Sequence, residues 1–445
     1  MTDLRLAVLP TLTGVALAAI AARLWYVQIA RAESLKERAT HSRIRTIPVP
    51  APRGAILDRD GRKLADVRAE LYVTVRPRLA ADPEVRARLA GVLGMRLDRL
   101  LAKLDGGGRV VVQVGTPVAA ASRIAERPDL FPGVEIASRA LRHYPDEFSA
   151  SHALGYVTFD PEAEEESGRS GLEAALDDRL KGRPGGRTIA VDARGRAVRE
   201  FAATPARPGE PLATTLDADL QKLATRLFAR RGYRGAAVAL DPRTGEVLLS
   251  VSAPVYGQSL FAGGLSRAEW AAVTDHPGKP LLDRATGSAY APGSTFKIVT
   301  ALAADVHGGL DPSARVYCDG AFRLGRSRFG CLGRHGSVNL EEATAKSCNV
   351  YFATLGHRIG REAIVRTARA LGLGTKPSTE LGGETAGTLP DERWLARSRA
   401  DGRWLPGDAI NASIGQGAVS ASAMQMAVVA ATAATGGTIP TPHYV

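Results

Sequence analysis

The sequence predicts an α+β protein that carries an N-terminal transmembrane helix, and three observations support this fold class. An uncharged apolar run occupies residues 6–22, residues 43–205 mix short β-like runs with helical pieces, and residues 212–445 begin with a helix, a β-hairpin and then long helical stretches. Segregated strands and helices are typical of an α+β fold rather than of an alternating βα fold. With 445 residues, of which 45% are hydrophobic and 23% charged, the chain has ordinary globular composition and is long enough for two or three domains.

The first element is the apolar run, which lies between Arg5 and Arg23. It is at the short end for a membrane-spanning helix, which needs about 17–25 residues, and residues 24–27 extend it with aromatic side chains suited to a membrane interface. We therefore predict that residues 6–27 form a transmembrane anchor. A cleavable signal peptide is the alternative, because small residues lie near the end of the apolar run. The anchor is favoured because residues 24–29 stay mostly apolar, whereas the sequence at a cleavage site turns polar.

The middle region is predicted to be a separate, β-rich domain over residues 43–205. Three β-branched and apolar runs predict strands at residues 70–75, 110–115 and 186–192, and an amphipathic run around residues 89–104 predicts a helix. A proline-rich segment, residues 205–211, predicts a boundary.

The last domain is predicted over residues 212–445. It begins with a helix-like run at residues 217–231, followed by two apolar runs around Asp241–Gly245 (DPRTG). This turn composition between β-branched residues predicts a β-hairpin.

The residues that carry chemistry begin with YAPGSTFK, residues 290–297, in which Pro292 and Gly293 break the chain and a helix is predicted to start at Ser294. A hydroxyl at a helix N-terminus lies near free backbone N–H groups, which favour a developing oxyanion. Lys297 lies one turn further along the same face, and burial lowers the pKa of a lysine enough for it to act as a base. This S-x-x-K arrangement predicts a serine nucleophile with a lysine base. The alternative is a helix-capping serine, although Ser294 is the only serine in the chain with lysine three residues later.

A second motif, S-x-N, is supplied by KSCN, which contains Ser347 and Asn349. Ser347 is expected to relay a proton to the leaving amine, and Asn349 is expected to bind the substrate amide and to orient Lys297. A polar turn before a helix is the alternative.

These motifs belong to a longer resemblance to class B penicillin-binding proteins, and specifically to the elongation branch, penicillin-binding protein 2. The segment at residues 51–65 resembles the R-G-x-I-x-D-R-x-G signature that follows the anchor of this family, and residues 144–157 and 168–185 resemble its non-catalytic module. Residues 280–297 and 410–427 resemble its transpeptidase domain, and Phe296 with the Cys/His-bearing insert points to the elongation branch.

The resemblance implies an elongated, β-rich pedestal or dimerisation domain followed by a penicillin-binding transpeptidase domain with a β-lactamase-like serine acyltransferase fold. It implies a serine-type D-Ala-D-Ala transpeptidase or carboxypeptidase that cross-links peptidoglycan stem peptides, is acylated by β-lactams and needs no cofactor for catalysis. It also implies a single-pass inner-membrane protein with residues 1–5 in the cytoplasm and the bulk of the chain in the periplasm. The implied partner is a membrane glycosyltransferase of the shape, elongation, division and sporulation family.

The family's third motif, K-T-G or K-S-G, is not in the sequence, because no lysine precedes Thr-Gly or Ser-Gly. We therefore expect a C-terminally truncated transpeptidase domain that lacks its last strands. A non-catalytic, membrane-tethered remnant that only binds cell-wall machinery is the alternative function. A β-lactamase is disfavoured because it needs no membrane anchor and no pedestal domain. A bifunctional penicillin-binding protein is disfavoured because it needs a glycosyltransferase domain, and residues 43–205 show no candidate set of catalytic glutamates. The net charge of +12 does not indicate nucleic-acid binding, because the arginines are scattered.

A metal site is predicted from the three cysteines, which share one window with a histidine. The ligands are expected to be Cys318, Cys331, His335 and Cys348. Three cysteines and one histidine are a standard structural zinc set, and some elongation-branch relatives resemble this by binding zinc at matching positions. A Cys318–Cys331 disulfide with a free Cys348, or three free thiols, are the alternatives.

Three other features are predicted to be structural. His152 is expected to be a packed, hydrogen-bonded histidine rather than a general base. The run of three glutamates at residues 164–166 is expected to be a solvated loop. In the family, residues 58–60 are implied to tie the pedestal together.

Overall fold

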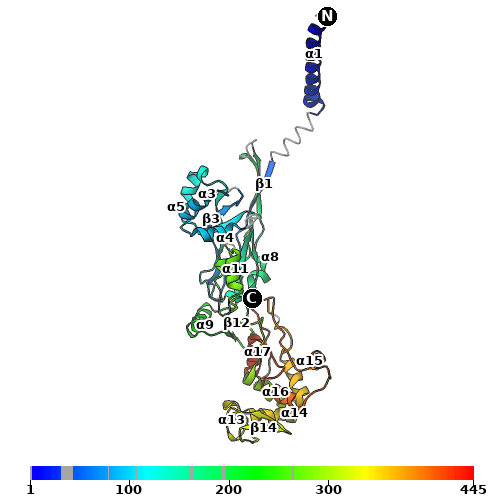
Figure 1. The fold of residues 1–445 in the computed structure, drawn as a ribbon. Helices are drawn as coiled ribbons and strands as arrows, with labels where there is room; N and C mark the ends of the chain where they lie inside the picture. The colour runs from blue at the N-terminus through cyan, green and yellow to red at the C-terminus, as the bar shows by residue number, and fades with distance from the viewer. Residues whose placement is uncertain are drawn as a thin grey trace. The chain divides into compact units, whose positions relative to one another are not determined.

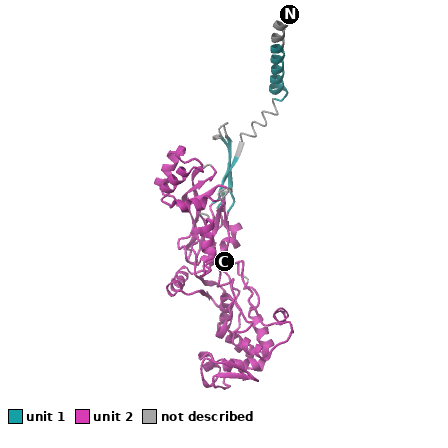
Figure 2. Cartoon of the chain, viewed as in Figure 1, with its two compact units in different colours: residues 1–51, 182–208 teal, residues 52–181, 209–445 magenta. Residues whose placement is uncertain are grey.

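The computed structural model describes residues 3–31, 44–78, 80–105, 108–160, 165–191, 197–262, 265–377 and 379–445. The chain divides into two compact units, one made of residues 1–51 with 182–208 and the other of residues 52–181 with 209–445 (Figure 2). The larger unit therefore joins segments from both of the domains predicted from the sequence, and the predicted boundary at residues 205–212 stays a prediction.

The smaller unit contains the predicted anchor and a three-stranded sheet. Helix α1 (Asp3–Trp25) continues into a π-helical turn, η1 (Tyr26–Ala30). Within the described residues, the segment Leu12–Ala30 is the one helix long and apolar enough to cross a membrane, with a mean hydropathy of 1.5 and no buried side chain. Such a helix satisfies its own backbone hydrogen bonds in lipid. The sheet pairs β1 (Ile44–Val49), β8 (Gly185–Val191) and β9 (Ala197–Thr204) in antiparallel order.

The larger unit begins with a five-stranded sheet formed by β2 (Ile56–Leu57), β3 (Lys63–Val75), β4 (Val110–Val114), β5 (Val134–His143) and β10 (Leu212–Ala213). Strand β3 pairs with both β4 and β5. The strands predicted at residues 70–75 and 110–115 are confirmed. Helices α3 (Pro83–Leu93), α4 (Leu97–Leu104) and α5 (Val118–Glu126), with the short η2 (Pro128–Leu130), lie around this sheet (Figure 1). They bury an apolar core that includes Val73, Leu89 and Leu100.

The single helix predicted around residues 89–104 is wrong, because the structure has two helices there. Gly94 takes a φ of 64°, and its N–H caps α3 through the carbonyls of Ala90 and Gly91. Glycine reaches this left-handed conformation without steric cost, so a helix commonly ends there. The apolar periodicity continues across the break because α4 packs on the same core, which explains why the sequence pattern did not reveal it.

Short elements follow this sheet along the chain. They are α6 (Ser151–Leu154), β6 (Val157–Asp160), β7 (Glu165–Gly168), α7 (Gly171–Ala175) and α8 (Asp177–Leu180). The carboxylate of Glu173 on α7 is fully buried and is held between Arg53 (2.7 Å) and Arg142 (2.5 Å). Buried charges are tolerated only when they are paired in this way.

The solvated loop predicted for the three glutamates is wrong for Glu166. This residue lies on β7, is 8% exposed and accepts a hydrogen bond from the backbone N–H of Arg142. Glu164 lies outside the described residues. The nearby Arg142 side chain supplies positive charge that a sequence pattern cannot show.

The helix and hairpin predicted at the start of the last domain are confirmed as α9 (Ala218–Arg231), β11 (Gly235–Leu240) and β12 (Val247–Ala253). Asp217 caps α9 by accepting from two backbone N–H groups. The remaining elements are α10 (Ser259–Ala262), α11 (Arg267–Thr274), η3 (Gly293–Phe296), α12 (Lys297–Val306), β13 (Val316–Cys318), β14 (Ala321–Leu324), β15 (Ser327–Gly330), β16 (Gly336–Val338), α13 (Leu340–Ala345), α14 (Asn349–Ala370), α15 (Glu392–Ser398), α16 (Pro406–Ser413) and α17 (Ala423–Ala434). The mixture of sheets and helices confirms the α+β class.

Candidate active site

Ser294 lies in η3, a single 3-10 turn directly before α12. The predicted α-helix therefore begins at Lys297 rather than at Ser294. Phe296 and Val299 are fully buried and fix this turn to the core, whereas Ser294 is exposed. Buried core anchors therefore follow closely after an outward-facing serine.

Lys297 is the centre of the site. It is 3% exposed, and its Nζ lies 3.2 Å from Ser294 Oγ and 2.9 Å from Ser347 Oγ. It also donates to the backbone carbonyl of Ser347 (2.7 Å) and to Asn349 Oδ1 (2.8 Å). The structure therefore brings together all four residues that the two motifs predict.

The second motif lies between α13 and α14. Ser347 takes a φ of 52°, which is a strained conformation for a residue with a side chain, and such strain is concentrated at functional sites. This conformation turns both the hydroxyl and the carbonyl of Ser347 toward Lys297. Cys348 then caps α14, and Asn349 is its first residue.

The electrostatics of the site suit a lysine base. Desolvation lowers the pKa of Lys297, and the nearby Cys331 and Cys348 oppose this shift. A cavity of about 610 Å³ opens beside Ser294 and Lys297, and most of its remaining walls are apolar. The apolar side chains that line it are Ile298, Ala301, Leu302, Leu340, Phe352, Met426 and Ala430. Apolar walls disfavour the charged form of the lysine.

A glycine loop after α16 supports the turn that carries Ser294, and neither motif predicts this loop. The N–H of Gly293 donates to the carbonyl of Gly415 over 2.9 Å. A Cβ at Gly415 would lie 2.3 Å from the carbonyl oxygen of Gly293, and the φ of Gly415 is 67°. The G-x-G spacing at residues 415–417 is the pattern that points to such a close backbone approach.

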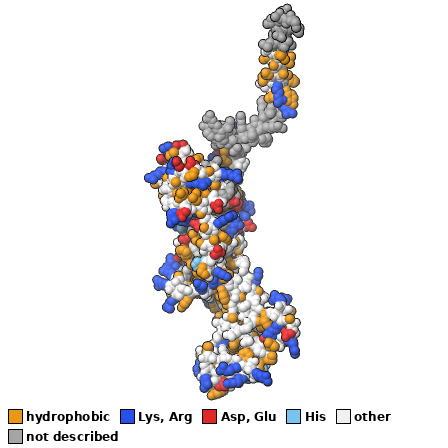
Figure 3. Space-filling view, in the orientation of Figure 1, with side chains coloured by type: hydrophobic (Ala, Val, Ile, Leu, Met, Phe, Trp, Pro, Cys, Tyr) orange, Lys and Arg blue, Asp and Glu red, His pale blue; other side chains and the backbone are white. Residues whose placement is uncertain are grey.

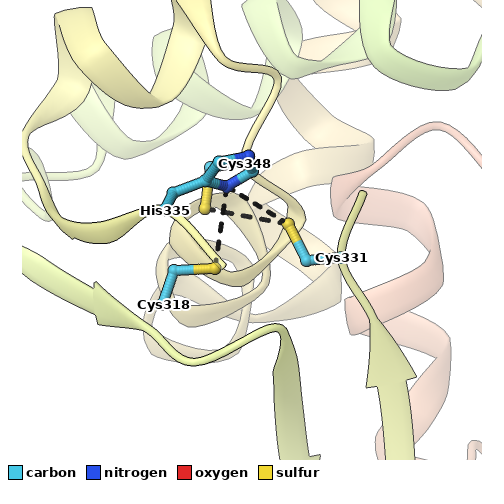
Figure 4. Close-up of side chains that lie close together, drawn as sticks. All are labelled: Cys318, Cys331, His335 and Cys348. Atoms are coloured by element: carbon cyan, nitrogen blue, oxygen red, sulfur yellow. Dashed lines mark hydrogen bonds between the residues drawn. The ribbon is translucent and has the colours of Figure 1, made fainter. Parts of the chain in front are cut away.

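The four predicted metal ligands also come together, from β13, the end of β15, the loop before β16 and the start of α14 (Figure 4). Their ligand atoms all lie within 4.8 Å of one another. His335 Nδ1 lies 3.7 Å from Cys318 Sγ and 3.6 Å from Cys331 Sγ. Zinc–sulfur bonds of about 2.3 Å in a tetrahedron separate the ligand atoms by about 3.5–3.8 Å, so this donor set fits zinc.

The thiols are free, so the alternative Cys318–Cys331 disulfide is not formed. Burial raises the pKa of Cys348 to about 12 in the absence of a metal ion. Burial acts in the same direction on Cys331, but backbone N–H groups outweigh it and lower the pKa of that thiol. Asn349 donates one of these bonds, from its backbone N–H over 3.2 Å. The cysteine–histidine cluster is therefore attached directly to the second motif.

The residues that were predicted to be structural lie elsewhere. His152 is 9% exposed and its Nε2 contacts the carbonyl of Pro280 at 2.7 Å, which confirms a packed, hydrogen-bonded histidine. Desolvation lowers the pKa of His152. Asp58 accepts from the backbone of Asp60 and from Arg62, so it stabilises a turn.

Comparisons with known protein families match two segments of the chain. Residues 48–214 match the penicillin-binding protein dimerisation domain. Residues 235–445 match the penicillin-binding protein transpeptidase domain.

Several curated proteins are similar over nearly the whole chain. Peptidoglycan D,D-transpeptidase MrdA of Acinetobacter baumannii is 31% identical, and the alignment covers 96% of this chain and 67% of that protein. MrdA of Escherichia coli K12 is 29% identical, with 97% and 71% covered. Stage V sporulation protein D of Bacillus subtilis is 31% identical, with 95% and 63% covered.

Solved structures agree with this result. The complex between penicillin-binding protein PBP2 and MreC from Helicobacter pylori matches with a TM-score of 0.77 and 26% identity, covering 90% of this chain and 79% of that one. A structure that describes the coordination of polymerization and crosslinking by a peptidoglycan synthase complex matches with a TM-score of 0.69 and 32% identity, covering 99% and 79%.

Proposed function

Since the chain belongs to the elongation-type class B penicillin-binding proteins, and is by family a peptidoglycan D,D-transpeptidase, we propose that it forms its acyl-enzyme on Ser294. The observation that carries this assignment is the convergence of two polar side chains, Lys297 and Ser347, on the exposed hydroxyl of Ser294. The non-catalytic alternative is not favoured by the relatives, which are named as transpeptidases.

The first step is acylation. Lys297, in its neutral form, takes the proton of Ser294, whose Oγ attacks the carbonyl carbon of the penultimate D-alanine of a stem peptide. The backbone N–H of Ser294 donates to the oxyanion that develops. The carbon–nitrogen bond to the terminal D-alanine then breaks, and the leaving nitrogen receives a proton through Ser347, which lies 2.7 Å from Ser294 Oγ.

The second step is deacylation. An amine from a neighbouring stem attacks the ester carbonyl, forms the new amide bond and loses its proton to the Lys297–Ser347 pair, while Ser294 recovers its hydroxyl. Asn349 holds Lys297 through its Oδ1, and its Nδ2, which donates one hydrogen to the carbonyl of Gly330, has a second hydrogen to offer to the substrate amide. No cofactor is consumed.

The test uses the full-length product of the gene, supplied with lipid-linked precursor and a membrane glycosyltransferase. Cross-linked muropeptides are measured after digestion of the product glycan. The wild-type protein is expected to form cross-links and Ser294→Ala is expected to form none. Ser398→Ala, at the exposed end of α15, is the control and is expected to behave as the wild type. Cross-links in the Ser294→Ala reaction would refute the assignment.

We also propose that Cys318, Cys331, His335 and Cys348 hold one structural zinc ion. Four protein ligands leave no open position for water, so the ion supplies rigidity rather than chemistry. Because Cys348 lies between Ser347 and Asn349, fixing its thiolate also fixes the direction of both catalytic neighbours.

The remaining proposals concern location, domains and partners. The N-terminal apolar helix fits a single-pass inner-membrane protein, and we propose that the bulk of the chain is periplasmic. We propose a dimerisation or pedestal domain over residues 43–205 and a transpeptidase domain over residues 212–445, which the matched segments support. The structural similarity to a peptidoglycan synthase complex supports a membrane glycosyltransferase as partner.

A further inference from the structure

A basic hairpin lies beside the candidate active site. Strands β14 and β15 pair antiparallel, with Phe322 opposite Phe329 and Arg323 opposite Arg328. The two phenylalanine rings contact each other, with centroids 6.4 Å apart, and the ring of Phe322 also contacts His357 of α14. Because alternate residues of a strand point to opposite faces, the two arginines lie on the outer face of the hairpin. We call residues 321–330 the arginine hairpin.

The surroundings of the hairpin are strongly positive. Residues 315–337 contain five arginines and one aspartate, which gives a net charge of +4 with histidine neutral. Lys and Arg side chains are visible over the end of the unit that carries β14 (Figures 1 and 3). Among the described residues, Arg326, Arg328 and Arg334 are exposed and take part in none of the ion pairs. Their charges are available to an external partner.

The arrangement of the arginines is not what stability alone favours. Arg323 and Arg328 face each other directly across the two strands, and like charges in that position destabilise a hairpin. Arg323 is neutralised by Asp319 at 2.7 Å, whereas Arg328 lies opposite it without an ion pair of its own among the described residues. The charge of Arg328 is therefore the one in this pair that an external anion can neutralise.

The hairpin also leads directly into the site. The carbonyl of Gly330, the last residue of β15, accepts a hydrogen bond from Asn349 Nδ2 over 3.0 Å. Arg328 is two residues earlier on the same strand, which places its Cα about 7 Å away. A peptide that reaches Asn349 therefore comes within range of the arginine side chain. Tyr317 and Leu332, which are 73% and 80% exposed, add apolar contact area next to these charges.

We propose that the arginine hairpin binds uncross-linked peptidoglycan strands through the carboxylates of their peptide stems. This inference rests on the proposed function, since it names the part of the substrate that this surface recognises. A stem peptide ends in a carboxylate and carries methyl groups, which match guanidinium groups beside an exposed tyrosine and leucine. Exposed charges of this kind raise the rate of encounter and select the partner more than they hold it.

The test measures binding of purified uncross-linked strands to the full-length gene product, with and without amidation of the stem carboxylates. The variant is Arg326→Glu with Arg328→Glu. It is expected to fold, because a glutamate at residue 328 would face Arg323 as an attractive pair. Its affinity for native strands is expected to fall about tenfold. Amidated strands are expected to bind the wild-type protein about tenfold more weakly, and to bind the variant with no further loss.

A matched control changes two exposed arginines of α9, as Arg226→Glu with Arg230→Glu, and is expected to retain wild-type affinity. Covalent labelling by penicillin needs Ser294 but no stem carboxylate at the hairpin, so the hairpin variant is expected to label normally. If penicillin failed to label the wild-type protein, that result would count against the proposed function rather than against the hairpin inference. Wild-type affinity of the hairpin variant for native strands would overturn the inference. The inference would also be overturned if the hairpin variant kept its affinity for native strands but lost binding to a phosphodiester polymer. The ligand of the hairpin would then be a phosphodiester.

Discussion

The hydroxyl of Ser347 lies 2.7 Å from the hydroxyl of Ser294, although the two residues are 53 positions apart in the chain. Lys297 Nζ contacts both hydroxyl oxygens, so a proton can move among the three groups without a water molecule. This relationship explains how one lysine can serve both halves of a transfer reaction. In the proposed mechanism, the protonation state of that lysine therefore controls the rate.

The first prediction concerns pH. Desolvation lowers the pKa of Lys297 below its ordinary value of 10.5, so the neutral base is present at a lower pH than for a free lysine. The acylation rate by a β-lactam is expected to rise with pH and to level off before pH 10.5 is reached. A rate that follows the titration of an ordinary lysine up to that pH would contradict the assigned base.

The same shift affects stability. Because the unfolded chain holds the lysine proton more tightly than the folded chain, stability rises with pH between the folded and the unfolded pKa of Lys297. Below the pKa of the folded state, Lys297 is charged in both the folded and the unfolded chain, and its burial lowers the free energy of unfolding by an amount that does not change with pH. Lys297→Met removes the titrating group, so its urea unfolding midpoint is expected to lose this part of the pH dependence.

A second prediction concerns the glycine loop. Gly415→Ala would bring a Cβ to 2.3 Å from the Gly293 carbonyl oxygen and 2.6 Å from Phe296 Cβ, so the nucleophile turn must shift. We expect a loss of about 2–4 kcal/mol in stability and a marked fall in the β-lactam acylation rate. Gly232→Ala is the matched control, because Gly232 has a similar φ of 63° but nothing within 4 Å of its Cβ position. It is expected to cost about 1 kcal/mol and to leave acylation unchanged. Equal effects of the two changes would show that the contact with Gly293 does not matter.

A third prediction concerns the metal. The purified protein is expected to contain one equivalent of zinc by elemental analysis. Cys331→Ala is expected to lower both the zinc content and the melting temperature, the latter by about 5 °C or more, because binding to the folded state adds to its stability. Leu332→Ala changes the neighbouring, 80% exposed side chain and is expected to alter neither quantity. Metal-free protein with unchanged stability would end the zinc proposal.

A fourth prediction concerns the buried carboxylate of Glu173, which is held between Arg53 and Arg142. Glu173→Gln leaves the buried Arg142 without its paired carboxylate and takes away one of the two carboxylates paired with Arg53, which keeps Asp177. We expect it to destabilise the protein by about 3–5 kcal/mol. Glu200→Gln breaks the exposed pair with Arg187, which solvent screens, and is expected to leave the unfolding midpoint nearly unchanged. Urea unfolding of both variants measures the difference. A small effect of the Glu173 change would mean that water replaces the lost carboxylate.

The four candidate catalytic residues could be predicted from the sequence because their spacing reflects local structure. Lys297 must follow Ser294 by one helical turn, and Asn349 must follow Ser347 at the start of a helix, so both pairs leave a pattern in the chain. The cysteine–histidine set was predictable for the same reason, since its ligands are scarce residue types within one short window.

The contacts that the sequence did not reveal depend on distant partners. Glu166 is buried only because the backbone of Arg142 lies opposite it on another strand. Gly415 accepts a hydrogen bond from Gly293, which lies 122 positions earlier in the chain. The residues around each glycine give no sign that the two are in contact. Gly94 interrupts a helix whose apolar periodicity continues, so the break appears only in the backbone conformation.

The most direct test of the central claim is to map the residue that a β-lactam acylates. The full-length gene product is incubated with penicillin, digested and analysed by peptide mass spectrometry. The account predicts one adduct, on Ser294, in the peptide that contains residues 290–297, and no adduct in Ser294→Ala. An adduct on another residue, or covalent labelling that survives in Ser294→Ala, would contradict the assignment of the nucleophile.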